Sequence, residues 1–233
     1  MCGARARELI EIHQLQAGLK VKISLFEEGL GMAEIISTNF EAVELSYQLS
    51  LQNPERENLH LIAAVARPQT LKKILHLAAS HGIKKVSFIK AENTEKSYLQ
   101  SKALEANNIA KEMQLAIEQS FDCFLPQVLV YKTYREFMQQ LPQAVNFQAA
   151  YKILADVPRI SESGNNSNTL LQLSSPNQEV ILAIGPEAGW VDKEREDFLK
   201  GGFLSYSLGK RIYRAEHALG MLFGQIAHSR VLR

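Results

Sequence analysis

The pattern of apolar and polar residues changes about fifty residues into the chain. Before that point the two kinds alternate with the period of two that is typical of β-strands. Segments 18–26, 32–36 and 43–51 follow it, and Gly29-Leu30-Gly31 is a turn signal between the first two. The strictest alternation places five apolar residues on one face: Val43, Leu45, Tyr47, Leu49 and Leu51. The pattern therefore predicts a small β-rich domain over residues 1–52.

A polar stretch at 52–58 reads as a linker, and beyond it short apolar runs alternate with segments of helical period. Strands are expected at 59–65, 85–89, 127–131, 151–155, 180–184 and 203–207. Helices are expected at 70–80, 98–119, 134–141 and 192–200, and from about 214 onward. A loop rich in Ser, Gly and Asn occupies 161–169. Strands that alternate with helices predict an α/β domain with a mostly parallel sheet over residues 57–233.

Two glycine turns mark a candidate ligand pocket. The apolar run 180–184 ends at Gly185-Pro186, and a second turn at Gly209 precedes a basic segment and the last helix. We expect these turns at the ends of neighbouring strands. Backbone N–H and C=O groups can approach a small polar ligand closely where side chains are absent. The two turns thus predict a pocket walled by backbone.

The joint pattern is more specific than either turn. Gly185-Pro-Glu-Ala-Gly189 is followed by Leu208-Gly209 and by Arg214-x-Glu216-x-Ala218. It resembles the cofactor motifs of SPOUT methyltransferases, above all the RsmE-type enzymes that methylate N3 of a uridine in 16S rRNA of the small ribosomal subunit. The resemblance extends over nearly the whole chain. It implies an α/β domain with a trefoil knot, a PUA-like N-terminal β-barrel, a cytoplasmic homodimer whose interface includes the final helix, and 16S rRNA or the 30S subunit as partner.

The resemblance also implies roles for individual residues. S-adenosyl-L-methionine would be the cofactor, and no metal would be needed. Arg214 and Glu216 would be the catalytic residues, one to stabilise charge on the uracil and one to accept the N3 proton. The alternative is a charge pair at the start of the last helix, where the helix dipole favours a glutamate. The residues implied in cofactor binding are Leu182, Ile184, Gly185, Gly189, Leu208, Gly209, Ile212 and Ala218.

Several positions depart from the family pattern, and they include Leu77 and Ser80, where a lysine and a glutamate are usual. Ala188 stands where a second glycine is usual, Ala215 and His217 replace two threonines, and Asp122 replaces an arginine. A carboxylate at position 122 would repel phosphate. His217 could serve as a polar partner or base, but a single histidine without supporting residues is more often a partly exposed helix residue. These departures keep open the alternative of a diverged, non-catalytic relative that binds cofactor or RNA.

Charge and composition narrow the function classes. The net charge is +1, and residues 1–58 hold five Lys and Arg against nine Asp and Glu, a balance of −4. An acidic domain is a poor general RNA binder, because phosphate contacts dominate affinity for nucleic acid. The two cysteines lack metal-ligand spacing, and no apolar run is long enough for a membrane span. A dinucleotide oxidoreductase is disfavoured, since no Gly-x-Gly-x-x-Gly follows the first α/β strand.

Overall fold

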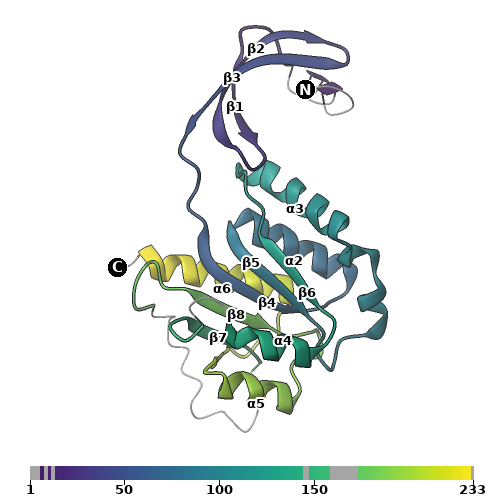
Figure 1. The fold of residues 1–233 in the computed structure, drawn as a ribbon, viewed down its shortest axis with the longest axis vertical. Coiled ribbons are helices and arrows are strands. Elements are labelled where there is room, and N and C mark those ends of the chain that lie inside the picture. Colours follow the sequence, from purple (N-terminus) through teal and green to yellow (C-terminus); the bar gives the residue numbers. More distant parts are fainter. Residues whose placement is uncertain (1–5, 8–9, 12–13, 144–146, 158–172, 232–233) are drawn as a thin grey trace. The chain divides into compact units, whose positions relative to one another are not determined.

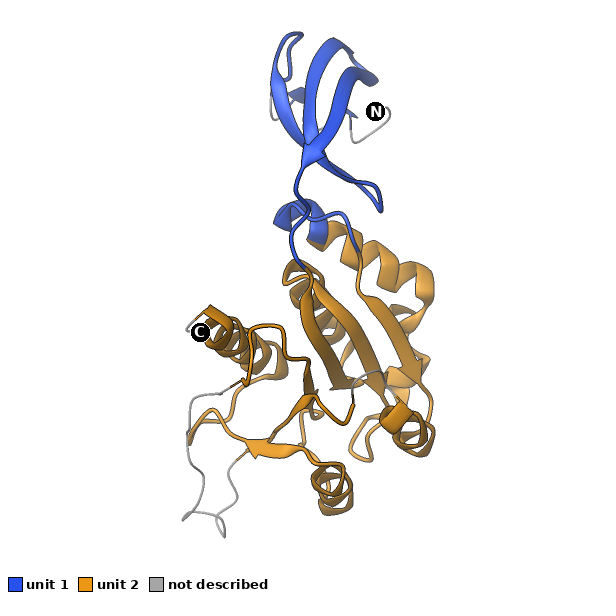
Figure 2. Ribbon diagram, turned by 60° about the vertical axis from the view of Figure 1, so that its left-hand side comes forward, with its two compact units in different colours: residues 1–55, 117–124 blue, residues 56–116, 125–233 orange. Residues whose placement is uncertain are grey.

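The computed structural model describes residues 6–7, 10–11, 14–143, 147–157 and 173–231. The chain divides into two compact units (Figure 2). Unit 1 comprises residues 1–55 and 117–124, and unit 2 comprises residues 56–116 and 125–233. A segment from the middle of the chain thus belongs to the first unit. The loop expected at 161–169 lies outside the described residues.

Unit 1 contains a three-stranded antiparallel sheet in the order β1-β2-β3 (Figure 1). The strands are β1 (Lys20–Leu25), β2 (Gly29–Asn39) and β3 (Ala42–Leu51). The register of β2 against β3 shifts between Leu30 and Met32. At that shift a Cβ on Gly31 would lie 2.1 Å from the carbonyl oxygen of Gln48. Only glycine permits the two backbones to come so close.

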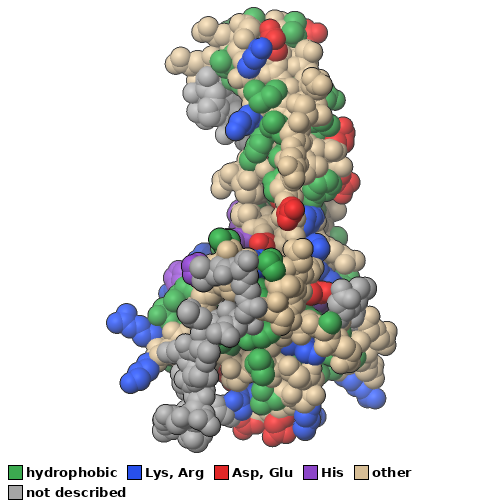
Figure 3. Space-filling view, turned by 90° about the vertical axis from the view of Figure 1, so that its left-hand side faces the viewer, with side chains coloured by type: hydrophobic (Ala, Val, Ile, Leu, Met, Phe, Trp, Pro, Cys, Tyr) green, Lys and Arg blue, Asp and Glu red, His purple; other side chains and the backbone are tan. Residues whose placement is uncertain are grey.

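The core of unit 1 is small. Ala6, Ile35 and Val43 are buried together, whereas the apolar residues further along β3, Tyr47 and Leu49, are exposed. The alternation therefore predicted the strand correctly but not a fully covered apolar face among the described residues. Figure 3 shows apolar side chains at the surface of this unit. The closed PUA-like barrel stays a prediction, because a three-stranded sheet alone does not define it.

Asp122 has a local structural role in unit 1. Its side chain is 6% exposed, and Oδ1 accepts hydrogen bonds from the backbone N–H groups of Cys123 at 2.6 Å and Phe124 at 3.1 Å. The Asp122 carbonyl oxygen also accepts a bond from the Ser24 hydroxyl. The carboxylate thus faces its own backbone, so its charge is not presented to a phosphate at the surface.

Unit 2 is built on a six-stranded sheet in the order β6-β5-β4-β8-β7-β9 (Figure 1). Every adjacent pair is parallel. The strands are β4 (Glu57–Ala64), β5 (Ile83–Ile89), β6 (Gln127–Tyr131), β7 (Tyr151–Ala155), β8 (Val180–Ile184) and β9 (Leu204–Tyr206). The helices are α2 (Pro68–Ser80), α3 (Ala106–Ser120), α4 (Tyr134–Gln140), α5 (Asp192–Lys200) and α6 (Ala215–Val231). The predicted α/β fold is confirmed.

Helices cover both faces of this sheet, which explains why its strands read as continuous apolar runs. On one face Ile62, Ile181 and Ala183 pack with Phe137 of α4 and Phe198 of α5. Helices α2 and α6 pack together over the other face (Figure 1). The α6 residues Leu219, Leu222, Phe223 and Ile226 are buried within this chain, so they are not available for the dimer interface expected at the final helix.

One predicted helix was wrong in extent. The segment expected to be helical from 98 to 119 contains two short 3₁₀ turns, Lys96–Gln100 and Lys102–Leu104, before α3 begins at Ala106. Ser101 has extended backbone angles, and its side chain accepts a hydrogen bond from the N–H of Ala103 at 3.2 Å. A serine hydroxyl that bonds to nearby backbone competes with helix hydrogen bonds, so the regular helix starts later.

A second correction concerns the order of strands. The glycine turns at 185 and 209 were expected at the ends of neighbouring strands, but β7 lies between β8 and β9. Parallel pairing of β7 with both neighbours brings three carboxyl ends to the same edge. The pocket therefore has a third contributing strand.

Candidate functional site

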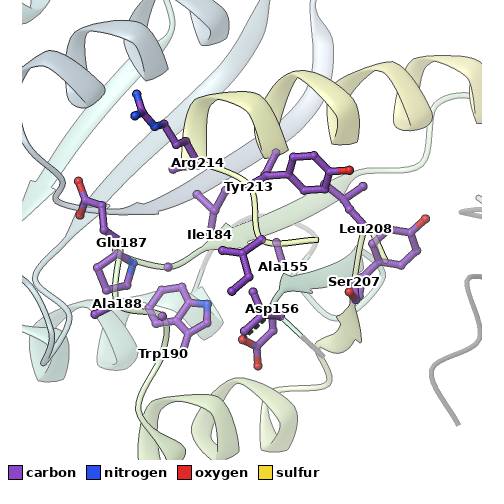
Figure 4. A pocket seen from close by; sticks show the side chains of 18 of the residues that line it. Ala155, Asp156, Ile184, Glu187, Ala188, Trp190, Ser207, Leu208, Tyr213 and Arg214 are labelled. Atoms are coloured by element: carbon purple, nitrogen blue, oxygen red, sulfur yellow. Dashed lines mark hydrogen bonds between the residues drawn. The ribbon is translucent and has the colours of Figure 1, made fainter. Parts of the chain in front are cut away.

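A cavity of about 400 Å³ lies at the carboxyl ends of β7, β8 and β9 (Figure 4). This volume is in the range of small-molecule sites, which in parallel α/β sheets lie at this edge. Its walls come from three chain segments that follow the strands and from the start of α6. The lining residues are Ala155, Asp156, Val157, Ile184, Gly185, Pro186, Glu187, Ala188, Gly189, Trp190, Tyr206, Ser207, Leu208, Arg211, Ile212, Tyr213, Arg214, Ala215 and Ala218.

The turn after β8 depends on the missing side chain of Gly185. A Cβ there would lie 3.2 Å from the indole of Trp190, which is tighter than ordinary van der Waals contact. The indole is 5% exposed and packs against Phe198 with ring centroids 5.0 Å apart. The N–H of Gly189 closes the turn on the carbonyl of Pro186 at 2.8 Å. Gly185 thus lets a large aromatic ring stand in the cavity wall.

Two hydrogen-bonding side chains fix this turn from the outside. Glu194 Oε1 accepts the N–H of Glu92 at 2.8 Å, and Oε2 accepts the N–H of Val191 at 3.3 Å. Asn93 Nδ2 donates to the carbonyl of Gly189 at 3.0 Å. Burial raises the pKa of the Glu194 carboxyl, although both backbone bonds act in the opposite direction. The loop after β5 and the turn after β8 are therefore joined beneath the cavity.

The turn after β9 is stabilised by the hydroxyl of Ser207, which lies within it. Ser207 Oγ accepts the N–H of Gly209 at 3.2 Å and donates to the Gly209 carbonyl at 3.1 Å. Gly209 has φ of +109°, a conformation that side chains disfavour. The Tyr206 hydroxyl donates to Gln225 Oε1 at 2.7 Å and so ties this strand to α6. Gly209 thus shapes the segment that carries Leu208 without itself lining the cavity.

Asp156, directly after β7, places a carboxylate in the cavity wall. Arg195 Nε donates to Oδ2 at 3.1 Å, and both side chains are largely buried. Asp156 Oδ1 accepts a hydrogen bond from the backbone N–H of Val157 at 2.9 Å, which is the dashed line in Figure 4. The arginine partner holds the carboxylate in one orientation. A fixed negative group in a largely apolar wall is suited to a cationic part of a ligand.

The start of α6 separates two charges that are close in sequence. Arg214 is exposed at the rim of the cavity, and its side chain extends outward on the side of Glu187 (Figure 4). Glu216 is 7% exposed and pairs with Lys73 of α2 at 3.0 Å. Burial raises the pKa of this carboxyl, but its hydrogen bonds to backbone and to Lys73 outweigh that effect, so the pKa is lowered. Glu216 does not line the cavity.

The structure brings most of the sequence-predicted site residues together. Seven line the cavity: Ile184, Gly185, Gly189, Leu208, Ile212, Arg214 and Ala218. Leu182 does not, because it lies two residues before the end of β8 and is fully buried in the sheet. Gly209 and Glu216 lie outside the wall, as described above.

Sequence reasoning missed Asp156 and Trp190 as site residues. Asp156 could have been found, because it directly follows a predicted strand of the parallel sheet. Trp190 belongs to the glycine motif and is the single tryptophan of the chain. Its place in the wall depends on Phe198 and Gly185, which the motif alone does not indicate.

Two further observations concern metal binding and membrane insertion in the described part of the chain. Within the described ranges, no three His, Cys, Asp or Glu side chains are grouped so that they could hold a metal ion. None of the described helices has the length and apolar character required to span a membrane.

The fold and the cavity define an α/β protein with a ligand site at the carboxyl edge of a parallel sheet. A model of the RNA methyltransferase domain family matches residues 52–227. The chain belongs to this family, and its resemblance to the RsmE-type methyltransferases is confirmed.

Curated relatives agree with this assignment. The chain is 27% identical over 218 residues to ribosomal RNA small subunit methyltransferase E 1 of Borreliella burgdorferi, with 92% of this chain and 85% of the relative covered. It is 28% identical over 209 residues to ribosomal RNA small subunit methyltransferase E of Treponema pallidum, with 88% and 75% covered.

Solved structures show the same fold. A probable rRNA methyltransferase from Porphyromonas gingivalis matches with a TM-score of 0.72 and 21% identity, over 98% of this chain and 92% of the other. Ribosomal RNA small subunit methyltransferase E of Neisseria gonorrhoeae, solved with S-adenosyl methionine, matches with a TM-score of 0.68 and 20% identity, over 98% and 89%.

We predict that the Glu216–Lys73 pair contributes to stability at neutral pH. A carboxyl whose pKa is lowered by folding stabilises the folded state above its unfolded value, here 4.5. That contribution is lost as the pH falls through the lowered folded pKa. Glu216→Gln should reduce the free energy of unfolding at pH 7 by about 0.5–1 kcal/mol, since Lys73 is more than half exposed. The deficit relative to wild type should shrink below pH 4.5.

Urea unfolding followed by the fluorescence of Trp190 measures this difference, because all three residues lie in unit 2. Glu196→Gln is the matched control, since Glu196 pairs with Lys200 at the surface of α5. It should change stability little at any pH. A deficit for Glu216→Gln that grows on acidification would contradict the lowered pKa.

Proposed function

We propose that this protein transfers a methyl group from S-adenosyl-L-methionine to N3 of a uridine in 16S rRNA. The observation that supports this best is the cavity at the carboxyl ends of β7, β8 and β9, with exposed Arg214 at its rim. The cofactor would bind in the cavity, and the uracil that accepts the methyl group would bind at the rim. Family membership and the rRNA methyltransferase relatives support the same choice of substrate.

The cavity fits the proposed cofactor in size and in chemistry. Gly185 and Gly189 expose backbone, and Ile184, Leu208 and Ala218 supply apolar wall for a nucleoside. The Asp156 carboxylate complements a positively charged ligand. When bound, S-adenosyl-L-methionine supplies an electrophilic methyl group on a sulfonium. The protein's part is to orient that group and to exclude water around it.

Arg214 is proposed to orient the uracil. Its carbonyl accepts the N–H of Ala218 at 2.9 Å, so it stands immediately before the first turn of α6. Arginine is not favoured there, since the positive end of the helix dipole repels a cation. Its presence is therefore better explained by substrate than by helix stability. The guanidinium would donate hydrogen bonds to a uracil carbonyl as negative charge develops on it.

Glu216 is proposed to position α6 and not to touch the substrate. A carboxylate with a lowered pKa is a weak base, and its ammonium partner occupies its oxygen. By holding α6 against α2, Glu216 fixes the place of Arg214 two residues earlier. His217 is exposed and does not line the cavity. It is therefore no better a candidate than Glu216 for the base that accepts the N3 proton.

The positions at which this chain differs from the family pattern do not favour the alternative of a non-catalytic relative. Ala188 and Ala215 line the cavity with methyl groups and leave it open. Asp122 serves its own backbone in unit 1. On the face in Figure 3, Lys and Arg side chains of unit 2 lie at several separate points. We propose that the RNA backbone contacts such dispersed cations, chiefly Arg211 at the cavity rim.

Several further properties are proposed on the basis of the family. They are the trefoil knot of unit 2, the PUA-like barrel of unit 1 and a cytoplasmic site of action on the 30S subunit.

A homodimer is proposed as well. Ile212 at the cavity rim is 82% exposed, and Met221 on α6 is 42% exposed. A second copy that covers the outer face of α6 would bury such apolar surface.

The proposed reaction is tested with 30S subunits from a strain that lacks the enzyme. Purified protein and methyl-labelled S-adenosyl-L-methionine should yield labelled 3-methyluridine after nuclease digestion of 16S rRNA. Naked 16S rRNA in parallel separates the two forms of substrate. Binding of cofactor by calorimetry without any methylated product would favour the non-catalytic alternative.

Arg214→Ala should lower the single-turnover rate about 10²- to 10³-fold, the usual effect of removing one donor at a developing charge. Affinity for the cofactor should change little, because the side chain extends away from the cavity interior. Lys210→Ala is the control, since Lys210 is an exposed cation of the same segment that does not line the cavity. Rates for Arg214→Ala within a few-fold of the control would remove Arg214 from the acceptor site.

Light scattering should report a particle of twice the 26.1 kDa of the chain at micromolar concentration. Met221→Lys should shift the equilibrium toward monomer by placing charge in the interface. Leu115→Lys is the matched control, because Leu115 on α3 is 41% exposed, close to the exposure of Met221. This variant should leave the dimer intact. A monomeric wild-type protein, or equal effects of the two variants, would exclude this interface.

A further inference from the structure

Trp190 presents an unusual polar atom at the cavity. Its Nε1–H is buried and has no hydrogen-bond partner among the described residues. The indole is 95% buried yet forms part of the cavity wall. A buried donor without an acceptor is unfavourable, so native structures rarely keep one without a reason.

The ring is held so that it cannot turn to find another acceptor. One side packs on Phe198, with ring centroids 5.0 Å apart. The edge that carries Nε1 lies along Gly185, 3.2 Å from the position of a Cβ there. Figure 4 shows the indole nitrogen on the side of the ring toward the cavity interior. The N–H is therefore without an acceptor from the described residues, on the side of the ring that faces the cavity interior.

We infer that Trp190 Nε1 donates a hydrogen bond to a neutral acceptor on the nucleoside part of the cofactor, and so helps to determine specificity. This inference rests on the proposed function. Neighbouring wall residues Ile184 and Ala188 are apolar, which suits a neutral ring nitrogen or hydroxyl oxygen. The cofactor's ammonium group cannot accept a hydrogen bond, and its charged carboxylate is disfavoured beside these apolar wall residues.

The inference is tested by removing the N–H and keeping the ring. Because the chain has one tryptophan, biosynthetic replacement by β-(3-benzothienyl)alanine changes Trp190 alone. The ligands are S-adenosylhomocysteine and 5′-methylthioadenosine, which lacks the amino-acid part. Calorimetry should show both binding roughly tenfold more weakly than to the unsubstituted protein, the usual effect of losing one neutral hydrogen bond. Thermal unfolding of the substituted protein should remain cooperative.

A second measurement uses the unaltered protein. Saturating S-adenosylhomocysteine should shift Trp190 emission to longer wavelength as its N–H gains an acceptor. An unchanged emission spectrum at saturation would overturn the inference even if the substituted protein failed to fold.

The outcomes separate this inference from the proposed function. If the unsubstituted protein binds neither ligand, the cofactor assignment itself fails. If both ligands bind and replacement changes neither affinity, the cofactor site stands and the role of Trp190 is refuted. A loss confined to S-adenosylhomocysteine would place the contact on the amino-acid part and refute the nucleoside assignment.

Discussion

The site depends on the parallel pairing of β7 with both β8 and β9. Parallel strands end at the same edge, so three chain segments distant in sequence must leave the sheet side by side. β8 is further fixed by its pairing with β4. Because helices cover both faces, the segments after the strands can diverge only beyond the sheet edge. The cavity lies where they do so.

Trp190 connects the core of unit 2 with this cavity. Its ring belongs to the aromatic cluster with Phe198 and Phe203, while its nitrogen edge lies along Gly185. A change in core packing would therefore move the cavity wall. Glu194 also fixes the wall from outside the cavity, because its carboxylate joins the loop after β5 to the start of α5. The position of the cavity wall is thus determined largely by residues that do not line it.

The sequence predicted local features well and long-range ones poorly. The strands at 127–131, 151–155 and 180–184 match β6, β7 and β8 residue for residue, because apolar runs bounded by turns are local signals. The assignment of 117–124 to unit 1 and the place of β7 between β8 and β9 are not local. Nor is the pairing of Glu216 with Lys73, which lies 143 residues away. Asp156 directly follows a predicted strand, but the strand order alone shows that this strand end shares a cavity with the ends of β8 and β9.

Arg214 and Glu216 have different surroundings although they share one motif. Arg214 precedes the helix and is exposed to whatever approaches the cavity rim, whereas Glu216 lies in the first turn and is buried against α2. The carboxylate is bonded to Lys73 and is thereby less able to neutralise Arg214. The rim keeps a cation while the helix start keeps the anion that its dipole favours. Two charges that share one motif are thus separated in three dimensions into an exposed cation at the cavity rim and a buried anion paired with α2.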